Sequence, residues 1–168
     1  MKPRIDSLES QRLHLEPRKE SHATEIYTLL SEKDLYHYIN KDAPTSVEWL
    51  ANGFKKLESL TSSDQKELWL AWIGKSKESN HPVGIFEITL VGSEAFIGYT
   101  VFKDFWSKGF ATEAVAAMID YISEVYRIDR FVIEMDTRNL ASVRIAEKLG
   151  FEFVGRRENV DFFKGGVS

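Results

Sequence analysis

The stretch FWSKGFATEA, residues 105–114, places a lysine, a glycine, small residues and a hydroxyl between two aromatics and the start of a helical pattern. AFIGYTVFK (95–103) precedes it as a strand, and apolar residues recur at helical spacing through 109–126. A chain that leaves a strand at Phe102 and enters a helix near Phe110 points several free backbone N–H groups at one place, which favours an anion. The stretch therefore predicts an anion-binding turn. Taken alone, it leaves a plain strand-to-helix turn open.

The side chains of this loop suit a phosphate. Gly109 and Ala111 keep bulk away from the backbone, so that an anion can approach it. One cation and two hydroxyls stand beside them: Lys108, Ser107 and Thr112. The loop is neither a Walker A motif, which needs GxxxxGK[ST], nor a GxGxxG dinucleotide fingerprint.

Length and composition limit the class of protein. With 168 residues, 43% of them apolar and 29% charged, the chain fits one globular domain over residues 1–168. No apolar run reaches the length of about 18 residues that suggests a membrane span, and the charged start lacks the apolar core of a signal peptide. We therefore expect a cytoplasmic protein with no membrane partner. The net charge of −4 disfavours nucleic acid as a partner.

The chain contains no cysteine, which excludes disulfides, thiolate metal sites and cysteine nucleophiles. The histidines show no metal-ligand spacing: His14, His22, His37 and His81. No metal is expected, and any acyl transfer must proceed without a cysteine nucleophile.

Periodicity predicts the elements before the loop. They are a strand over 12–17, a helix over 23–30, a helix that Ser46 caps, and a hairpin of strands over 67–75 and 82–92. The second helix is expected to bury an apolar stripe of Trp49, Leu50, Phe54 and Leu57.

After the loop, the order helix, strand, helix predicts a crossover to a parallel strand. RFVIEMDT (130–137) is the strand, and Asn139–Leu149 the last helix, with Gly150 as its left-handed stop and Phe151 packing back on its last turn. The tail GFEFVGRRENVDFFK (150–164) is expected to add one strand. The fold class is α+β, with a mostly antiparallel sheet.

Two segments together resemble the signature blocks of the GNAT N-acetyltransferase superfamily. The first, written [R/Q]-x-x-G-x-[G/A] in that family, stands here at 106–111 with Trp106 in the first place. The second is TRNLASVRIAEKLGF (137–151). The tryptophan followed by ATEA, with SEAFIGYTV and SQRLHLEP upstream, is similar to the RimJ/RimL branch of ribosomal-protein alanine N-acetyltransferases. The likeness covers residues 10–157 and implies helices on both sheet faces and splayed fourth and fifth strands.

The resemblance implies acetyl-CoA as cosubstrate. The pyrophosphate is expected on the loop, at Ser107, Lys108, Gly109, Phe110, Ala111 and Thr112. The pantetheine is expected to bond like an extra strand along Tyr99–Phe102, at Val101 and Phe102, with Asn139 as a further contact. In such proteins a bulge in this strand commonly frees an N–H group that polarises the thioester carbonyl.

The implied reaction is direct attack of a primary amine on the thioester. At pH 7 about one α-amino group in eight is neutral, against about one lysine side chain in 2,500, so a protein N-terminus is the favoured acceptor and a small-molecule amine is possible. The tyrosine that many members use as general acid is absent, because Ala146 stands in its place. Ser142 is the expected replacement. Glu87, with apolar neighbours that should desolvate it, is the expected base, and Glu94 and Glu134 are its rivals. An outward-facing Glu87 without a catalytic role, or a water relay that needs no single base, stays open.

Several alternatives remain open at this stage. A catalytically weak acyl-CoA-binding or regulatory module would also keep the cofactor loop. The usual closing strand is not evident at FFKGGVS, so either the sequence is truncated before that strand or another subunit completes the sheet, and the protein is expected to be a monomer or a homodimer. Tyr36, His37, Tyr38 and Trp49 form either an aromatic acceptor wall or part of the core.

Overall fold

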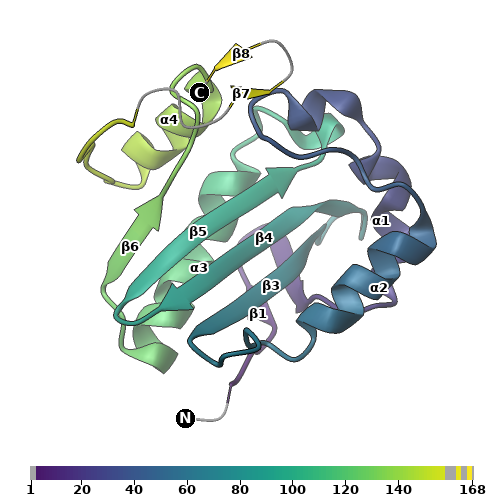
Figure 1. Ribbon diagram of the computed structural model, residues 1–168, viewed down its shortest axis with the longest axis horizontal. Helices are drawn as coiled ribbons and strands as arrows, with labels where there is room; N and C mark the ends of the chain where they lie inside the picture. The colour runs from purple at the N-terminus through teal and green to yellow at the C-terminus, as the bar shows by residue number, and fades with distance from the viewer. Residues whose placement is uncertain (1–2, 158–161, 164–165, 168) are drawn as a thin grey trace.

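A six-stranded sheet of order β1-β2-β3-β4-β5-β6 forms the centre of the computed structural model, which describes residues 3–157, 162–163 and 166–167 (Figure 1). Its strands are β1 (Leu8–Glu9), β2 (Leu13–Pro17), β3 (Glu67–Ser76), β4 (Pro82–Val91), β5 (Glu94–Val101) and β6 (Arg130–Ile133). Neighbours pair antiparallel except β5 and β6, which pair in parallel. The predicted α+β class and parallel crossover are confirmed.

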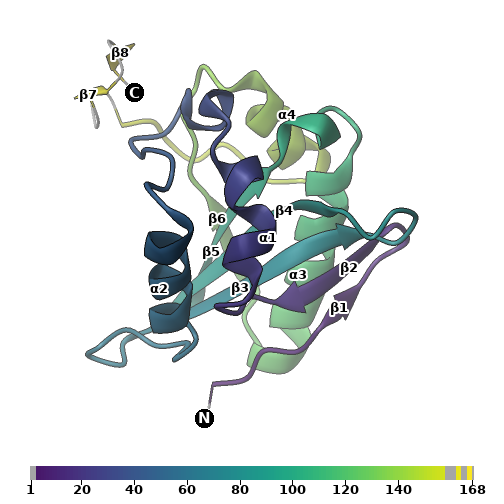
Figure 2. The same ribbon diagram turned by 90° about the vertical axis from the view of Figure 1, so that its right-hand side faces the viewer.

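Helices cover both faces of this sheet. The α-helices are α1 (His22–Leu30), α2 (Val47–Leu57), α3 (Phe110–Tyr126) and α4 (Leu140–Lys148), and two short 3₁₀ helices that the sequence did not predict are η1 (Lys33–Tyr36) and η2 (Lys103–Phe105). Figure 2 shows α1 and α2 on one side of the sheet and α3 on the other. None of the helices in the described part of the chain is long and apolar enough to cross a membrane.

The two faces carry separate hydrophobic cores because successive strand residues point to opposite sides. Trp72 of β3 packs in the α3 core, whereas its neighbour Ile73 packs in the core under α1 and α2. Both side chains are fully buried. The central strand β3 is therefore covered on both faces.

The cap of α2 forms as predicted, but its buried stripe is narrower. Ser46 Oγ accepts the Trp49 N–H at 3.0 Å. Leu50 and Phe54, four residues apart on one side of the helix, are buried. Trp49 is 55% exposed, so its expected place on the stripe is wrong, since one helical step rotates it away from that side.

Local capping also defines α4. Asn139 Oδ1 accepts the Ser142 N–H at 3.2 Å, and Gly150 has φ +83°. The N–H of Gly150 bonds to Glu147 O at 3.0 Å and that of Phe151 to Ala146 O at 2.9 Å. This pair of bonds is the Schellman motif that the predicted left-handed stop requires.

The strand expected in the tail is wrong for the residues that are described. Residues 151–157 carry no strand, and Phe153 and Val154 are 80% and 94% exposed. Two-residue strands β7 (Phe162–Phe163) and β8 (Gly166–Val167) pair with each other and not with the main sheet. Residues 158–161 and 164–165 of this tail lie outside the described residues. Within the described chain, β6 is therefore the edge of the sheet.

Candidate active site

The sheet opens where β6 stops before β5 does. β6 pairs with β5 only from Glu94 to Ile97, whereas β4 follows β5 as far as Val101. Among the described residues, the last four of β5 thus have a partner strand on one side only. The fourth and fifth strands that the resemblance implies correspond to β5 and β6 here. They separate after Ile97, on the side of β5 that faces away from β4, so the expected splay is met at residues 98–101.

The hydrogen-bond pattern between β4 and β5 determines which backbone groups of β5 are free along this opening. The Phe102 N–H bonds to Val83 O of β4 at 2.8 Å, so Phe102 is not free to bind there, and its side chain is 1% exposed. Hydrogen bonds alternate along an antiparallel pair, so Tyr99 and Val101 direct their N–H and C=O groups away from β4. The β4–β5 register is continuous. The expected bulge is therefore absent, and the groups are open because β6 is short.

The chain then turns through the predicted anion loop. Ser107 and Gly109 both have left-handed φ angles, +59° and +80°. No side chain caps the α3 N-terminus, which begins directly after Gly109. Alternating left-handed residues make a concave nest of N–H groups, and the helix start adds a positive partial charge. This arrangement can hold an anion through the backbone.

The side chains of the loop contribute less than expected. Lys108 Nζ donates to Asp104 O at 2.9 Å and so is turned back onto its own loop. Phe110 and Ala111 are buried, whereas Ser107 is exposed and Thr112 half-buried. The indole of Trp106 donates from Nε1 to Val101 O at 2.7 Å, so the residue in the first place of the motif joins the loop to the open strand.

A shallow hollow of about 230 Å³ lies on the α1 and α2 side of the opening. Its lining comes from β4, β5 and the end of β6: Glu87, Thr89, Phe96, Ile97, Gly98, Val132 and Glu134. Two of the three candidate bases, Glu87 and Glu134, thus share one cavity. The third, Glu94, pairs with Arg130 at 2.7 Å at the start of β5 and does not line the hollow.

The surroundings of Glu87 differ from the prediction. Its side chain is 48% exposed, so the expected desolvation is wrong; the apolar neighbours along β4 point to the opposite face or under the helices. Arg18 Nη1 lies 3.4 Å from Glu87 Oε1. Arg18 is itself buried against the Phe54 ring, and this burial lowers its pKa.

The start of α4 brings a second set of polar groups to the opening. Asn139 uses its Oδ1 as the helix cap, and Ser142 lies one turn into the helix. The hydroxyl of Tyr99 is buried and has no hydrogen-bond partner among the described residues. Burial raises the pKa of Tyr99, and the nearby Ser142 hydroxyl lowers it to a smaller extent, although the two groups do not meet hydrogen-bond geometry.

The aromatic residues of the α1–α2 connection do not form one wall. Tyr36 is buried, and its hydroxyl donates to Leu30 O at 2.5 Å, which makes it a core residue. Tyr38 lies beside Arg138, with the guanidinium carbon 6.0 Å from the ring centroid. Arg138 forms a bidentate pair with Asp136, whose pKa it lowers. The connection thus contacts the segment before α4 through Tyr38, while Trp49 points to solvent.

Sequence reasoning missed three residues that the fold brings to this region. Tyr99 was named only for its place in the pantetheine strand and not for its hydroxyl, Trp106 was noted only as a mark of the family branch, and Arg12 was part of the first strand pattern. Arg12 Nη1 donates to Lys108 O at 2.9 Å across 96 positions of sequence. Local sequence patterns cannot predict a contact between positions so far apart in the chain. Among the described residues, no group of three His, Cys, Asp or Glu is placed to hold a metal ion.

Comparison with known proteins places this geometry in context. The family profile described as acetyltransferase (GNAT) domain matches residues 12–152. The uncharacterized N-acetyltransferase p20 of Bacillus licheniformis is 24% identical over 164 residues, covering 96% of this chain and 90% of that protein. A probable N-acetyltransferase of Bacillus subtilis, YjcK, is 27% identical over 159 residues, covering 91% and 88%.

Solved structures share the fold. RimL, a ribosomal L7/L12 α-N-protein acetyltransferase in complex with coenzyme A, superposes with a TM-score of 0.84 at 20% identity over 96% of this chain and 93% of that one. The ribosomal-protein-S5-alanine acetyltransferase from Vibrio fischeri gives a TM-score of 0.81 at 18% identity, with 97% and 91% coverage.

Proposed function

The chain belongs to the acetyltransferase (GNAT) domain family and is an acetyl-CoA-dependent acyltransferase, and on that premise we propose that it acetylates a primary amine that enters through the hollow between Glu87 and Glu134. The observation that carries the proposal is the opening beside β5: on the side away from β4, residues 98–101 pair with no described strand, and the chain continues through η2 into a nest of N–H groups at the start of α3. An elongated ligand with an anionic end fits that arrangement.

The donor site divides between strand and loop. The N–H groups of the loop from Ser107 to Thr112 would hold the pyrophosphate of coenzyme A, because a helix start and a nest both favour anions. The open backbone of Tyr99 and Val101 would bond the pantetheine as an added strand. One of these donors is the Val101 N–H, since its carbonyl already accepts the Trp106 indole. Asn139 keeps its Nδ2 donors for the same ligand, because Oδ1 serves as the cap.

The acceptor side carries two carboxylates, Glu87 and Glu134, each of which pairs with an arginine: Arg18 at 3.4 Å and Arg157 at 3.2 Å. Either carboxylate can take the proton that the amine must lose before it attacks. The N–H groups of β5 next to the opening would stabilise the oxyanion that forms on the thioester carbonyl. Ser142 would return a proton to the departing thiolate, with the buried Tyr99 hydroxyl behind it. No covalent enzyme intermediate through a thiol is available, because the chain has no cysteine.

A protein N-terminal α-amine is the acceptor that we favour. RimL and the S5 alanine enzyme, which share the fold, act on ribosomal proteins by their names, and an α-amine needs less help from a base than a lysine does. A monomeric or homodimeric protein of the cytoplasm remains our prediction.

The reaction can be tested by release of free coenzyme A thiol. The purified protein is given acetyl-CoA with a peptide that has a free N-terminus and no lysine, with the same peptide blocked and carrying one lysine, or with a polyamine. We expect release with the first peptide. Release with the polyamine alone would move the acceptor to small molecules, and no release above background with any amine would favour a binding module without turnover.

Coenzyme A binding is tested separately by calorimetry. Gly109→Glu puts a carboxylate into the nest and should abolish binding, whereas Gly53→Glu adds the same charge on the open surface of α2, where nothing lies within 4 Å of an added Cβ. Circular dichroism checks that both variants remain folded. Unchanged affinity in folded Gly109→Glu would refute the loop assignment.

A further inference from the structure

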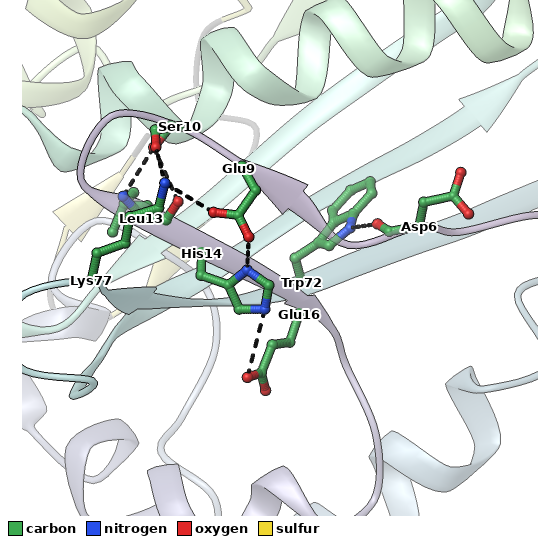
Figure 3. Close-up of polar contacts among 8 residues, drawn as sticks. All are labelled: Asp6, Glu9, Ser10, Leu13, His14, Glu16, Trp72 and Lys77. Atoms are coloured by element: carbon green, nitrogen blue, oxygen red, sulfur yellow. Dashed lines mark hydrogen bonds and ion pairs between the residues drawn. The ribbon is translucent and has the colours of Figure 1, made fainter.

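The turn between β1 and β2 is tied to the sheet by its backbone. The Ser10 N–H bonds to Leu13 O at 2.9 Å, and the Leu13 N–H bonds to Ser10 Oγ at 3.1 Å. Lys77, just after β3, donates its backbone N–H to Arg12 O at 2.8 Å and its Nζ to Ser10 O at 2.6 Å. Figure 3 shows Ser10, Leu13 and Lys77 converging on this turn. These hydrogen bonds therefore hold the backbone of Arg12 in place at the turn before β2.

From that point Arg12 reaches the loop that precedes α3. Its Nη1 donates to Lys108 O at 2.9 Å, and its guanidinium carbon lies 4.2 Å from the centre of the Phe110 ring. Its Nε lies 3.5 Å from Glu113 Oε2 in the first turn of α3. One side chain thus contacts the loop before the helix, the first residue of the helix and its first turn.

The contact with Lys108 supports an unusual backbone. Ser107 is not a glycine, yet it has φ +59°, a conformation that costs about 1–2 kcal/mol for most residues. Lys108 O follows it directly and would otherwise face solvent beside the nest. A charged donor on that oxygen favours the loop conformation in which the N–H groups converge.

The contact with Glu113 concerns charge. Glu113 Oε2 is buried without a hydrogen-bond partner among the described residues, and its side chain is only 17% exposed. A carboxylate at this place, one turn from the nest, repels a bound diphosphate. The Arg12 guanidinium at 3.5 Å is the cation that offsets it.

We propose that Arg12 is a positioning residue of the coenzyme A pyrophosphate loop, which it holds in its left-handed conformation through Lys108 while it screens the charge of Glu113. The proposal rests on the proposed function. It assigns a guanidinium to a loop whose own first motif place holds Trp106 instead of Arg or Gln.

The test measures coenzyme A affinity and steady-state kinetics in the full chain. Arg12→Met should weaken binding by about ten- to a hundredfold and raise the KM for acetyl-CoA equally, with kcat and the KM for the amine unchanged. Arg12→Lys keeps the positive charge but loses the forked guanidinium donors, so its affinity for coenzyme A should lie between those of the wild type and Arg12→Met. The control Arg130→Met, which removes the ion pair with Glu94 at the start of β5, should leave the affinity for coenzyme A unchanged.

A second substitution separates charge from general structure. In the Arg12→Met background, Glu113→Gln removes the unscreened carboxylate and should recover part of the lost affinity, which no purely structural role of Arg12 predicts. Wild-type affinity in Arg12→Met overturns the proposal, and so does a fall in kcat without a change in the acetyl-CoA KM. If the wild-type protein itself binds no coenzyme A, the proposed function fails first, so the two failures are distinct.

Discussion

Gly84 of β4 packs directly against the backbone of β5, and replacing it with alanine should damage stability and donor binding together. A Cβ at this position would lie 2.4 Å from Thr100 O and 3.1 Å from Val101 Cα, where ordinary contact begins at 3.4 Å. Both neighbours are backbone atoms and cannot rotate away. The two strands must therefore separate locally by about 1 Å, the difference between the Thr100 O distance and ordinary contact.

The size of the effect follows from two terms. Overpacking of this kind costs about 1–3 kcal/mol. The nearby bond from Phe102 N–H to Val83 O, 2.8 Å long, would stretch, which costs about 1 kcal/mol more. The free energy of unfolding should thus fall by about 2–4 kcal/mol in total. Because Val101 belongs to the strand that would bind pantetheine, the KM for acetyl-CoA should also rise.

Gly98→Ala is the matched control. Gly98 lies on the neighbouring strand with nothing within 4 Å of an added Cβ, so its replacement should change stability by less than about 0.5 kcal/mol. It lines the hollow, and its methyl group should therefore affect the KM of the amine rather than that of acetyl-CoA. Urea unfolding followed by circular dichroism measures both variants. Equal unfolding midpoints for Gly84→Ala and wild type, at equal slopes, would refute the close approach of the strands.

Three further predictions concern α4 and the groups around it. Gly150→Ala, at φ +83°, should lower the free energy of unfolding by about 1 kcal/mol, whereas Gly53→Ala in the open middle of α2 should raise it by a similar amount; urea unfolding with the opposite order would contradict the Schellman stop. Arg138 lowers the pKa of the buried Asp136 below its usual 3.8, so this pair stabilises the fold above that pH. The contribution is lost as the pH falls through the lowered pKa of Asp136 in the folded protein. Asp136→Asn should therefore flatten the acid limb of a stability–pH curve, and an unchanged limb would argue against the pair. Ser142→Ala should lower kcat by about a hundredfold or more. Tyr99→Phe should lower kcat without loss of stability, since its hydroxyl has no hydrogen bond to lose among the described residues. Wild-type kcat in both variants would refute Ser142 of α4 as the proton donor.

The parts of the fold that sequence predicted well depend on local chemistry. Ser46 and Asn139 cap the helices that follow them, and Gly150 ends α4, because each satisfies backbone groups within a few residues. The strands and the left-handed turn before α3 were predicted for the same reason, since the residues that set a strand's periodicity or form a turn are adjacent in sequence. Gly109 in particular occupies a left-handed position that local pattern can reveal.

The parts that failed depend on which surfaces meet. The alternation of apolar and polar residues identified β4. It did not reveal that the Glu87 side chain is about half exposed beside Arg18. The tail was apolar enough for a strand, yet residues 151–157 pair with no strand of the sheet. Arg12 and Lys108 come together only because β1, β2 and α3 pack in one core, and no periodicity encodes a contact between positions so distant.

The hydrogen bond from the Trp106 indole to Val101 O makes the intrinsic fluorescence of this tryptophan a reporter of ligand binding. This indole is 41% exposed and sits at the corner between the open strand and the loop, so a ligand that fills the corner changes its polarity and its hydrogen bonding. Its emission should therefore shift as coenzyme A is titrated. The chain has four tryptophans, and the difference between wild type and Trp106→Phe isolates the signal of this one. Donor binding can thus be followed in real time without a label, even while the acceptor is unidentified.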